Sequence, residues 1–272
     1  MLDQLDLSAV CAVALDVDGT LAGPDSLVND RTIEALSAVA ALDVPVFLLT
    51  GRTRANTLDI ARRAGLRHLV AACNGSLIFD PVGDADLSVT PMKADEKADF
   101  RSMADDLGLD LTWWTAERIH VAHDGPMAEL IRVLNHEVPT VSDPDEIATK
   151  DVLTMMAYAE PAHLNEVKDE VLRRCPGAMR SLDSLFEDVH RNATKWHALE
   201  WILDHYQLDS AEVLGMGDCG NDVVWLREIG HPVAMGNARD EVKQVALAEA
   251  PGHGEDGVAV LLERLAAGRS AS

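Results

Sequence analysis

Short apolar runs alternate with helix-like segments at both ends of the chain, and this alternation limits the fold more than any other feature. In the first part, the runs 9–16, 45–50 and 68–72 are separated by segments of helical periodicity, one beginning near Asp30 and one at about 53–64. Successive strand–helix–strand units build parallel sheets with right-handed crossovers. The sequence therefore predicts an α/β fold with a doubly wound, mainly parallel, Rossmann-like sheet.

The middle of the chain breaks this alternation. There two strand-like runs, Leu109–Thr115 and Arg118–His123, follow each other without an intervening helix, an order that favours antiparallel pairing. The length of 272 residues also exceeds the roughly 100–150 residues of a usual single core. We therefore expect an α/β core made of 1–80 and 185–272, with an inserted α+β cap domain at 81–184.

Local signals place the ends of several elements. Asn29 or Asp30 can cap the first helix, Gly65 can end the second, and Asn74-Gly75 is a tight-turn dipeptide. After the insertion, the alternation predicts helices at about 195–206, 221–229 and 257–265, and strands at 212–216 and 232–235.

Composition excludes several classes of function. Asp and Glu number 46 against 23 Lys and Arg, and the net charge of -23 argues against binding to nucleic acid or anionic membranes. With a mean hydropathy of -0.01, the sequence has no apolar run near the roughly 18 residues of a membrane span. The acidic start lacks the basic region of a secretory signal. We expect a cytoplasmic protein with no obligate protein partner.

The four cysteines show neither a C-x-x-C pair nor a histidine at zinc spacing. We expect all four to be reduced and mostly buried. Cys219 falls within a polar loop, where we interpret it as a bystander rather than a nucleophile.

Three polar segments follow predicted parallel strands. They are Asp16–Thr20 (Asp-Val-Asp-Gly-Thr), Thr50–Arg52 (Thr-Gly-Arg) and Gly217–Asp222 (Gly-Asp-Cys-Gly-Asn-Asp). In open α/β sheets, ligands bind at the carboxyl edge of the strands. Each segment alone has the composition of an ordinary turn, but three at one edge indicate a functional site.

The acidic residues of these segments suggest a metal site. Asp16 and Asp18 lie two residues apart, so both can point into one cavity where the strand ends. Asp218 and Asp222 add carboxylates from the third segment, although Asp222 could instead only cap the helix that follows. Oxygen ligands without His or Cys are typical of a hard cation, Mg²⁺ before Zn²⁺.

Phosphate binding needs donors as well as a metal. Thr50 offers a hydroxyl, Gly51 allows close approach of its backbone N–H, and the next helix presents its positive end. Lys195 begins a predicted helix of the core and can enter the site, although composition alone favours a solvated surface lysine.

These residues together resemble the haloacid dehalogenase (HAD) superfamily, specifically its Cof-type (subfamily IIB) phosphatases, which carry a cap after the second motif. The resemblance covers nearly the whole chain. Besides the three segments, it includes Asn74-Gly75, 233–238 (Val-Ala-Met-Gly-Asn-Ala) and 255–259 (Glu-Asp-Gly-Val-Ala). Trp196 departs from the pattern, because family members commonly have glycine after the motif lysine.

The resemblance implies a magnesium-dependent phosphatase that forms a phosphorylated aspartate. Asp16 would attack phosphorus, while Asp18 would first protonate the departing alcohol and then activate water. The implied Mg²⁺ ligands are Asp16, the main-chain carbonyl of Asp18, Asp218 and Asp222. The implied phosphate contacts are Thr50, Gly51, Lys195 and Asn221.

Two other functions fit the same residues. A sugar phosphomutase of the same superfamily would use Asp16 and Asp18 and return the phosphoryl group to a sugar. A non-catalytic protein that binds a phosphometabolite would need no turnover. In each case the expected partner is a small phosphorylated metabolite.

Cap strands supply candidates for the rest of the substrate. Strand parity places Leu111 and Trp113 on one face and Thr112 and Trp114 on the other. The same parity groups Ile119, Val121, Met155 and Ala157 as an apolar set that should pack on the cap's helices, and His120 with the mixed set. We expect Trp114 to contact substrate or to fill a domain junction, and Arg52 and Asn74 are further candidates for substrate contact.

Overall fold

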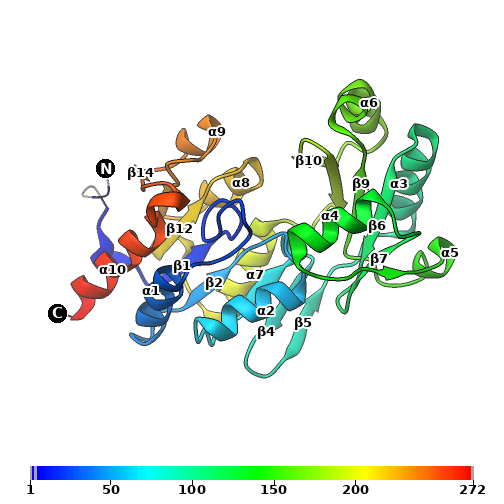
Figure 1. Ribbon diagram of the computed structural model, residues 1–272. Coiled ribbons are helices and arrows are strands. Elements are labelled where there is room, and N and C mark those ends of the chain that lie inside the picture. Colours follow the sequence, from blue (N-terminus) through cyan, green and yellow to red (C-terminus); the bar gives the residue numbers. More distant parts are fainter. Residues whose placement is uncertain (1, 3–4, 271–272) are drawn as a thin grey trace. The chain divides into compact units, whose positions relative to one another are not determined.

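The computed structural model describes Leu2 and residues 5–270, which form two compact units (Figure 1). The first unit comprises the chain up to Ser88 and from Thr194 onward, and the second comprises Val89–Ala193. The predicted boundaries of 81 and 184 differ from these. Strand β5 (Ala85–Val89) belongs to the sheet of β4 (Leu77–Asp80), and β11 (Leu185–Val189) pairs with β9 (Thr154–Tyr158) of the second unit.

A five-stranded parallel sheet forms the centre of the first unit, in the order β14-β13-β12-β1-β2. The chain runs outward from β1 to β2 and later returns to the other side of β1, so the topological switch point lies between β1 and β12. Its strands are β1 (Ala12–Leu15), β2 (Val46–Leu48), β12 (Val213–Gly217), β13 (His231–Ala234) and β14 (Ala248–Glu249). The predicted mainly parallel sheet is confirmed.

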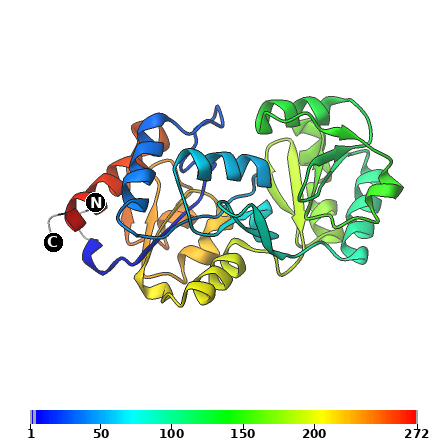
Figure 2. The same cartoon turned by 90° about the horizontal axis from the view of Figure 1, so that it is seen from below.

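Helices cover both faces of this sheet (Figure 2). Helices α1 (Asp30–Ala40) and α10 (Gly257–Ser270) pack together on one face, and α7 (Lys195–Tyr206) packs with α8 (Val223–Leu226) on the other. The Asn29 side chain caps α1 by accepting the Thr32 backbone N–H at 2.9 Å, as predicted. The remaining helices of this unit are α2 (Arg54–Arg63) and α9 (Asp240–Lys243).

The predicted helix at 221–229 is shorter in the structure. A 3₁₀ turn, η5 (Gly220–Asp222), precedes the four-residue α8, because the Asp222 carboxylate accepts the backbone N–H groups of Asp218 and Cys219 and tightens the loop. The other 3₁₀ turns are η2 (Leu7–Ala9), η3 (Cys73–Gly75), η4 (Ser210–Glu212) and η6 (His253–Glu255).

A small antiparallel sheet extends the first unit beside β2. Strand β3 (Val70–Ala72) pairs with β4, and a parallel bridge joins Leu49 to Ala71. The predicted turn at Asn74-Gly75 lies in η3, where Cys73, Asn74 and Gly75 all have positive φ. Backbone hydrogen bonds from Cys73 to Arg52 and from Asn74 to Thr50 hold this turn against the second polar segment.

The second unit contains a six-stranded sheet in the order β10-β11-β9-β6-β7-β8, antiparallel except between β7 and β8. The strands not yet given are β6 (Asp110–Trp114), β7 (Ile119–Val121), β8 (Thr140–Val141) and β10 (Met179–Leu182). Its helices are α3 (Ala94–Leu107), α4 (Pro126–Asn135), α5 (Pro144–Ile147) and α6 (Pro161–Arg174).

The six-stranded sheet of the second unit has two different faces. Leu111 and Trp113 pack with Phe100 of α3 and Leu164 of α6 in one apolar core, which agrees with the predicted parity of β6. The grouping of β7 with that face was wrong. Pairing puts His120 opposite Trp113, and Ile119 and Val121 opposite Trp114 and Thr112, because the cross-strand register decides which face each residue joins.

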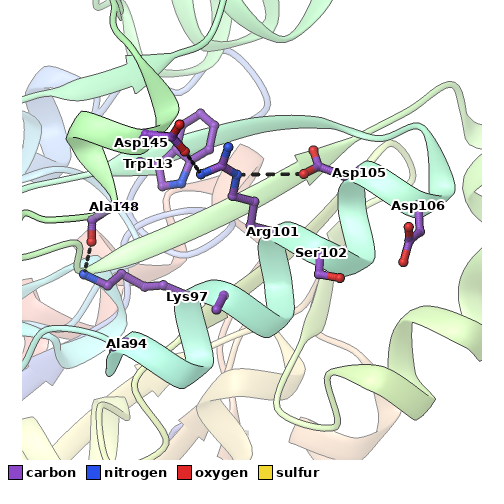
Figure 3. Close-up of a pocket in the computed structure, with 10 residues that line it drawn as sticks. Ala94, Lys97, Arg101, Ser102, Asp105, Asp106, Trp113, Asp145 and Ala148 are labelled. Atoms are coloured by element: carbon purple, nitrogen blue, oxygen red, sulfur yellow. Dashed lines mark hydrogen bonds and ion pairs between the residues drawn. The ribbon is translucent and has the colours of Figure 1, made fainter.

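A cavity of about 480 Å³ opens beside α3 in the second unit (Figure 3). Arg101 lies between Asp145, at 2.6 Å, and Asp105, at 3.8 Å, and Lys97 Nζ donates to the Ala148 carbonyl at 2.7 Å. Both cations therefore already interact with groups that also line the cavity. The cavity is lined by Ala94, Lys97, Ala98, Arg101, Ser102, Asp105, Asp106, Trp113, Asp145 and Ala148.

All four cysteines are free thiols, as expected. Cys73 and Cys175 are buried, Cys219 is half-buried, and Cys11 is exposed, so the expectation of burial was wrong for Cys11. No helix in the described part of the chain is both long and apolar enough to cross a membrane.

Candidate active site

Two glycines of strand β12 leave room for side chains that follow the strand. Gly215 and Gly217 lie two residues apart and so share one face of the strand. A Cβ atom at Gly217 would lie 2.7 Å from the Asp222 side chain, and one at Gly215 would collide with the Trp225 ring. The two glycines therefore let Asp222 and Trp225 lie directly on the strand.

Asp16, directly after β1, meets Lys195 at the switch point. Lys195 is the first residue of α7, which begins after the capping residue Thr194, and its Nζ lies 2.5 Å from Asp16 Oδ1. The same Nζ lies 2.7 Å from Asp222 Oδ1. Asp16 is only 4% exposed and Lys195 only 3%, so the ion pairs are shielded from water.

Burial and charge shift the pKa values of these groups. Burial raises the pKa of Asp16 well above its usual range, opposed by Lys195 and reinforced by Asp222 and Asp218. Burial alone would lower the pKa of Lys195, but the carboxylates of Asp16 and Asp222 outweigh it and raise that pKa. Lys195 therefore stays a cation. Burial, and next the Asp222 charge, raise the pKa of Asp218 to about 6.

Three carboxylates converge at this point. Asp16, Asp218 and Asp222 each offer an oxygen, and these atoms lie within 4.8 Å of one another. Among the described residues, Asp218 Oδ1 is buried and finds no hydrogen-bond partner. An orphaned carboxylate oxygen in an all-oxygen cluster fits a hard divalent cation.

Asp222 differs from the other two acids because both its oxygens are occupied. Oδ1 accepts Lys195 Nζ and the Trp225 indole N–H, and Oδ2 accepts the backbone N–H groups of Asp218 and Cys219, each at 3.0 Å. A carboxylate has about four lone-pair sites. A metal bond from Asp222 would require it to give up one of these donors.

Asp18 lies at the more open side of the site and pairs with Arg52. Arg52 Nη2 lies 2.6 Å from Asp18 Oδ1, and Arg52 Nε lies 3.1 Å from both carboxylate oxygens. Arg52 Nη2 also donates to the Ser26 carbonyl at 2.8 Å. The structure therefore brings Arg52 to the acid of the first motif.

Asn74 supports the second polar segment, Thr50–Arg52. Thr50 is fully buried, and its Oγ1 accepts the Arg52 backbone N–H at 3.0 Å. A Cβ atom at Gly51 would lie 3.2 Å from Asn74 Oδ1, so glycine lets the amide pack against the loop. Asn221 Nδ2 lies 3.4 Å from the same Oδ1 and links the second and third segments.

Two residues of the site were not predicted from the sequence. Asn237 Nδ2 donates to the Gly19 carbonyl at 2.8 Å and so ties the first segment to the loop after β13. Asn237 lies in the motif 233–238, for which the sequence predicted no particular contact. Trp225 was also missed, although the glycines at alternate positions of β12 signal that a bulky group packs there.

Trp114, the cap candidate, belongs to the second unit. Its side chain is buried, with 2% exposed, and its indole N–H donates to Thr112 Oγ1 at 3.0 Å. The indole is therefore anchored within its own strand.

Sequence comparison finds the same resemblance as the motifs. Residues 13–262 match the family of haloacid dehalogenase-like hydrolases. An HMP-PP phosphatase of Serratia proteamaculans is 27% identical over 85% of this chain and 86% of its own. A 5-amino-6-(5-phospho-D-ribitylamino)uracil phosphatase of Bacillus subtilis is 25% identical over 91% of this chain and 92% of its own.

Comparison of structures agrees with the sequences. The solved structure of a HAD subclass IIB sugar phosphatase superposes with a TM-score of 0.80 and 26% identity, covering 93% of this chain and 98% of that one. The HAD fold therefore extends over both units of the chain.

Proposed function

The chain belongs to the haloacid dehalogenase-like hydrolase family, and we propose that it is a magnesium-dependent phosphatase that hydrolyses small phosphate monoesters through a phosphorylated Asp16. The observation that carries the proposal is the buried Asp16 carboxylate, which Lys195 holds at 2.5 Å beside the unpartnered Oδ1 of Asp218. A carboxylate shielded from water and fixed by a cation is suited to attack phosphorus.

In the first step an oxygen of Asp16 bonds to phosphorus as the ester P–O bond breaks. Lys195, Thr50, the Gly51 N–H and Asn221 would neutralise the phosphoryl oxygens as charge develops on them. Lys195 Nζ contacts Oδ1 and so restrains the orientation of the carboxylate. Asp18, which must enter this step as the protonated acid, gives its proton to the departing alcohol oxygen.

In the second step Asp18 acts in the opposite direction. It takes a proton from water, whose oxygen bonds to phosphorus while the bond to Asp16 breaks, and inorganic phosphate leaves. The Asp18 side chain is 53% exposed, which suits a group that must reach both an alcohol and a water. Asp16 and Asp18 then return to their starting states.

The acid cluster fits the magnesium that this chemistry needs. Asp16, Asp218 and the main-chain carbonyl of Asp18 would hold the ion, and it would neutralise phosphoryl charge when bound. Asp222, predicted as a further ligand, carries four hydrogen bonds and would have to release one to join them.

The relatives support a proposal for the substrate class. HMP-PP phosphatases and a sugar phosphatase are among them, so we propose a sugar phosphate or a cofactor-related phosphate as the substrate. A panel of such esters, each assayed for inorganic phosphate, tests this. Phosphate release above the rate without enzyme is expected. Isomerised sugar phosphate without free phosphate would identify a phosphomutase, and tight binding without turnover a binding protein.

Metal dependence has its own test. EDTA should abolish phosphate release, and Mg²⁺ should restore it, as should Mn²⁺ or Co²⁺, while Ca²⁺ should inhibit because it prefers more ligands. Calorimetric titration of Mg²⁺ into the wild type and into Asp218→Asn supplies a readout without turnover. Activity restored by Zn²⁺ alone would contradict the hard-cation site.

A further inference from the structure

Trp225 makes a buried polar contact with the candidate active site. The side chain is 0% exposed, and its Nε1–H donates to Asp222 Oδ1 at 2.9 Å. The same oxygen accepts Lys195 Nζ at 2.7 Å, and Lys195 reaches Asp16 Oδ1 at 2.5 Å. A continuous line of hydrogen bonds therefore joins the indole to the proposed nucleophile.

The local sequence builds this line. Asp222 and Trp225 are three residues apart in consecutive helical turns, so their side chains lie on one face. That face lies on β12 at Gly217 and Gly215, where a Cβ atom would strike Asp222 and Trp225 respectively. Two glycines and one indole therefore contribute to where the Asp222 carboxylate lies.

The indole differs from the other donors to Asp222. The backbone N–H groups of Asp218 and Cys219 hold Oδ2, and the indole adds a neutral attachment at the other oxygen, Oδ1. At Oδ1, the Lys195 ammonium is charged and rotatable, whereas the indole is neutral, rigid and only a donor. Because the indole only donates, it can hold the Asp222 carboxylate without accepting a hydrogen bond from Lys195.

From these contacts we propose that Trp225 is a positioning residue for the phosphoryl-transfer reaction. It holds the Asp222 carboxylate in the orientation that keeps Lys195 Nζ on Asp16. This role rests on the proposed function of the site.

Trp225→Phe tests the role because it keeps an aromatic ring at this position and removes the N–H, together with part of the buried indole. We expect kcat for phosphate release to fall about tenfold while KM changes less than about twofold, as for loss of a residue that orients a catalytic group. Trp201→Phe is the matched control. Trp201 lies on α7 and stacks on His205 at 5.4 Å between ring centroids, so its replacement should leave kcat unchanged.

A double variant separates positioning from loss of packing. If Trp225 acts through Asp222, then Asp222→Asn combined with Trp225→Phe is no slower than Asp222→Asn alone. If the role of Trp225 were purely structural, Trp225→Phe would lower kcat by the same factor, and the melting temperature by the same amount, in the wild type and in Asp222→Asn. That result would overturn the proposal.

The hydrogen bond can also be observed without turnover. The Trp225 indole N–H gives one ¹H–¹⁵N signal, assigned by its loss in Trp225→Phe or, if that variant does not fold, by selective labelling. We expect slow hydrogen exchange and an upfield move of this signal in Asp222→Asn. A signal unchanged by Asp222→Asn would overturn the proposal. A wild-type protein that hydrolyses no ester would overturn the proposed function and leave this spectroscopic result standing.

Discussion

Arg52 and Asp18 form a two-point ion pair across the first and second motifs. Arg52 Nη2 lies 2.6 Å from Asp18 Oδ1, and the Arg52 side chain is only 11% exposed, against 53% for Asp18. The Ser26 carbonyl holds the same guanidinium group. A half-buried cation with fixed partners therefore orients the more exposed acid.

Replacing Arg52 should expose the acid role of Asp18. In Arg52→Gln the carboxylate loses its orienting partner, so protonation of the leaving group becomes less effective. Hydrolysis of an alkyl phosphate, whose alkoxide needs that proton, should fall roughly tenfold or more. Hydrolysis of p-nitrophenyl phosphate should fall much less, because nitrophenolate leaves without a proton. Steady-state kcat on the two esters makes the comparison.

Arg54→Gln is the matched control for this experiment. Arg54 lies two residues further along and pairs with Asp84 at 2.8 Å and Asp86 at 2.7 Å. Its replacement should not distinguish the two esters. Equal losses on both esters in Arg52→Gln would show that Arg52 serves phosphate or substrate binding instead.

Asp188 on β11 predicts a pH-dependent stability of the cap. Burial raises its pKa to about 6, and Glu96 adds to this, while the Val189 N–H and Arg191 oppose it. The folded state therefore binds the proton more tightly than the unfolded chain, whose value is near 3.8. Stability from this group is present below about pH 4 and is lost as the pH rises through about 6.

Asp188→Asn should therefore raise the melting temperature at about pH 8 and change it little at about pH 4. The amide can still accept the Val189 N–H, which lies 3.0 Å from Asp188 Oδ1. Asp183→Asn, at an exposed position between β10 and β11, is the control. A difference in melting temperature that is the same at both pH values would contradict this account of Asp188.

The elements whose signals are local could be predicted from the sequence. Helix α7 runs from Lys195 to Tyr206 as expected, and Asn29 caps α1, because caps and periodicity act within a few residues. The two main acids of the site, Asp16 and Asp218, follow parallel strands and meet as the strand order requires.

The contacts that the sequence could not supply join distant residues. Lys195 and Asp16 are 179 positions apart, and by composition a lysine is expected in solvent. The partner of Arg52 likewise depends on how two loops meet. The face of His120 depends on register with β6, which parity within β7 does not determine.

The neighbouring indoles of β6 should respond differently to truncation. Trp113→Ala should lower the free energy of unfolding by about 3–5 kcal/mol, because the ring fills the core beneath α3 and α6. Trp114→Ala should also lower the free energy of unfolding, because its ring is only 2% exposed, but it alone should raise KM for the preferred phosphometabolite while leaving hydrolysis of p-nitrophenyl phosphate unchanged. Kinetics and thermal melts of both variants provide the test. If Trp114→Ala had unchanged kinetics while Trp113→Ala stayed stable but bound the substrate more weakly, the two faces of β6 would be assigned the wrong way round.

The most direct test of the mechanism is to trap the phosphorylated enzyme. Asp18→Asn should slow hydrolysis of the intermediate, so acid quenching during turnover followed by peptide mass spectrometry should find one phosphoryl group on Asp16. Asp16→Asn should fold, carry no phosphoryl group and release no phosphate. Phosphate release by purified Asp16→Asn at the wild-type rate, or a phosphoryl group on another residue, would contradict the account.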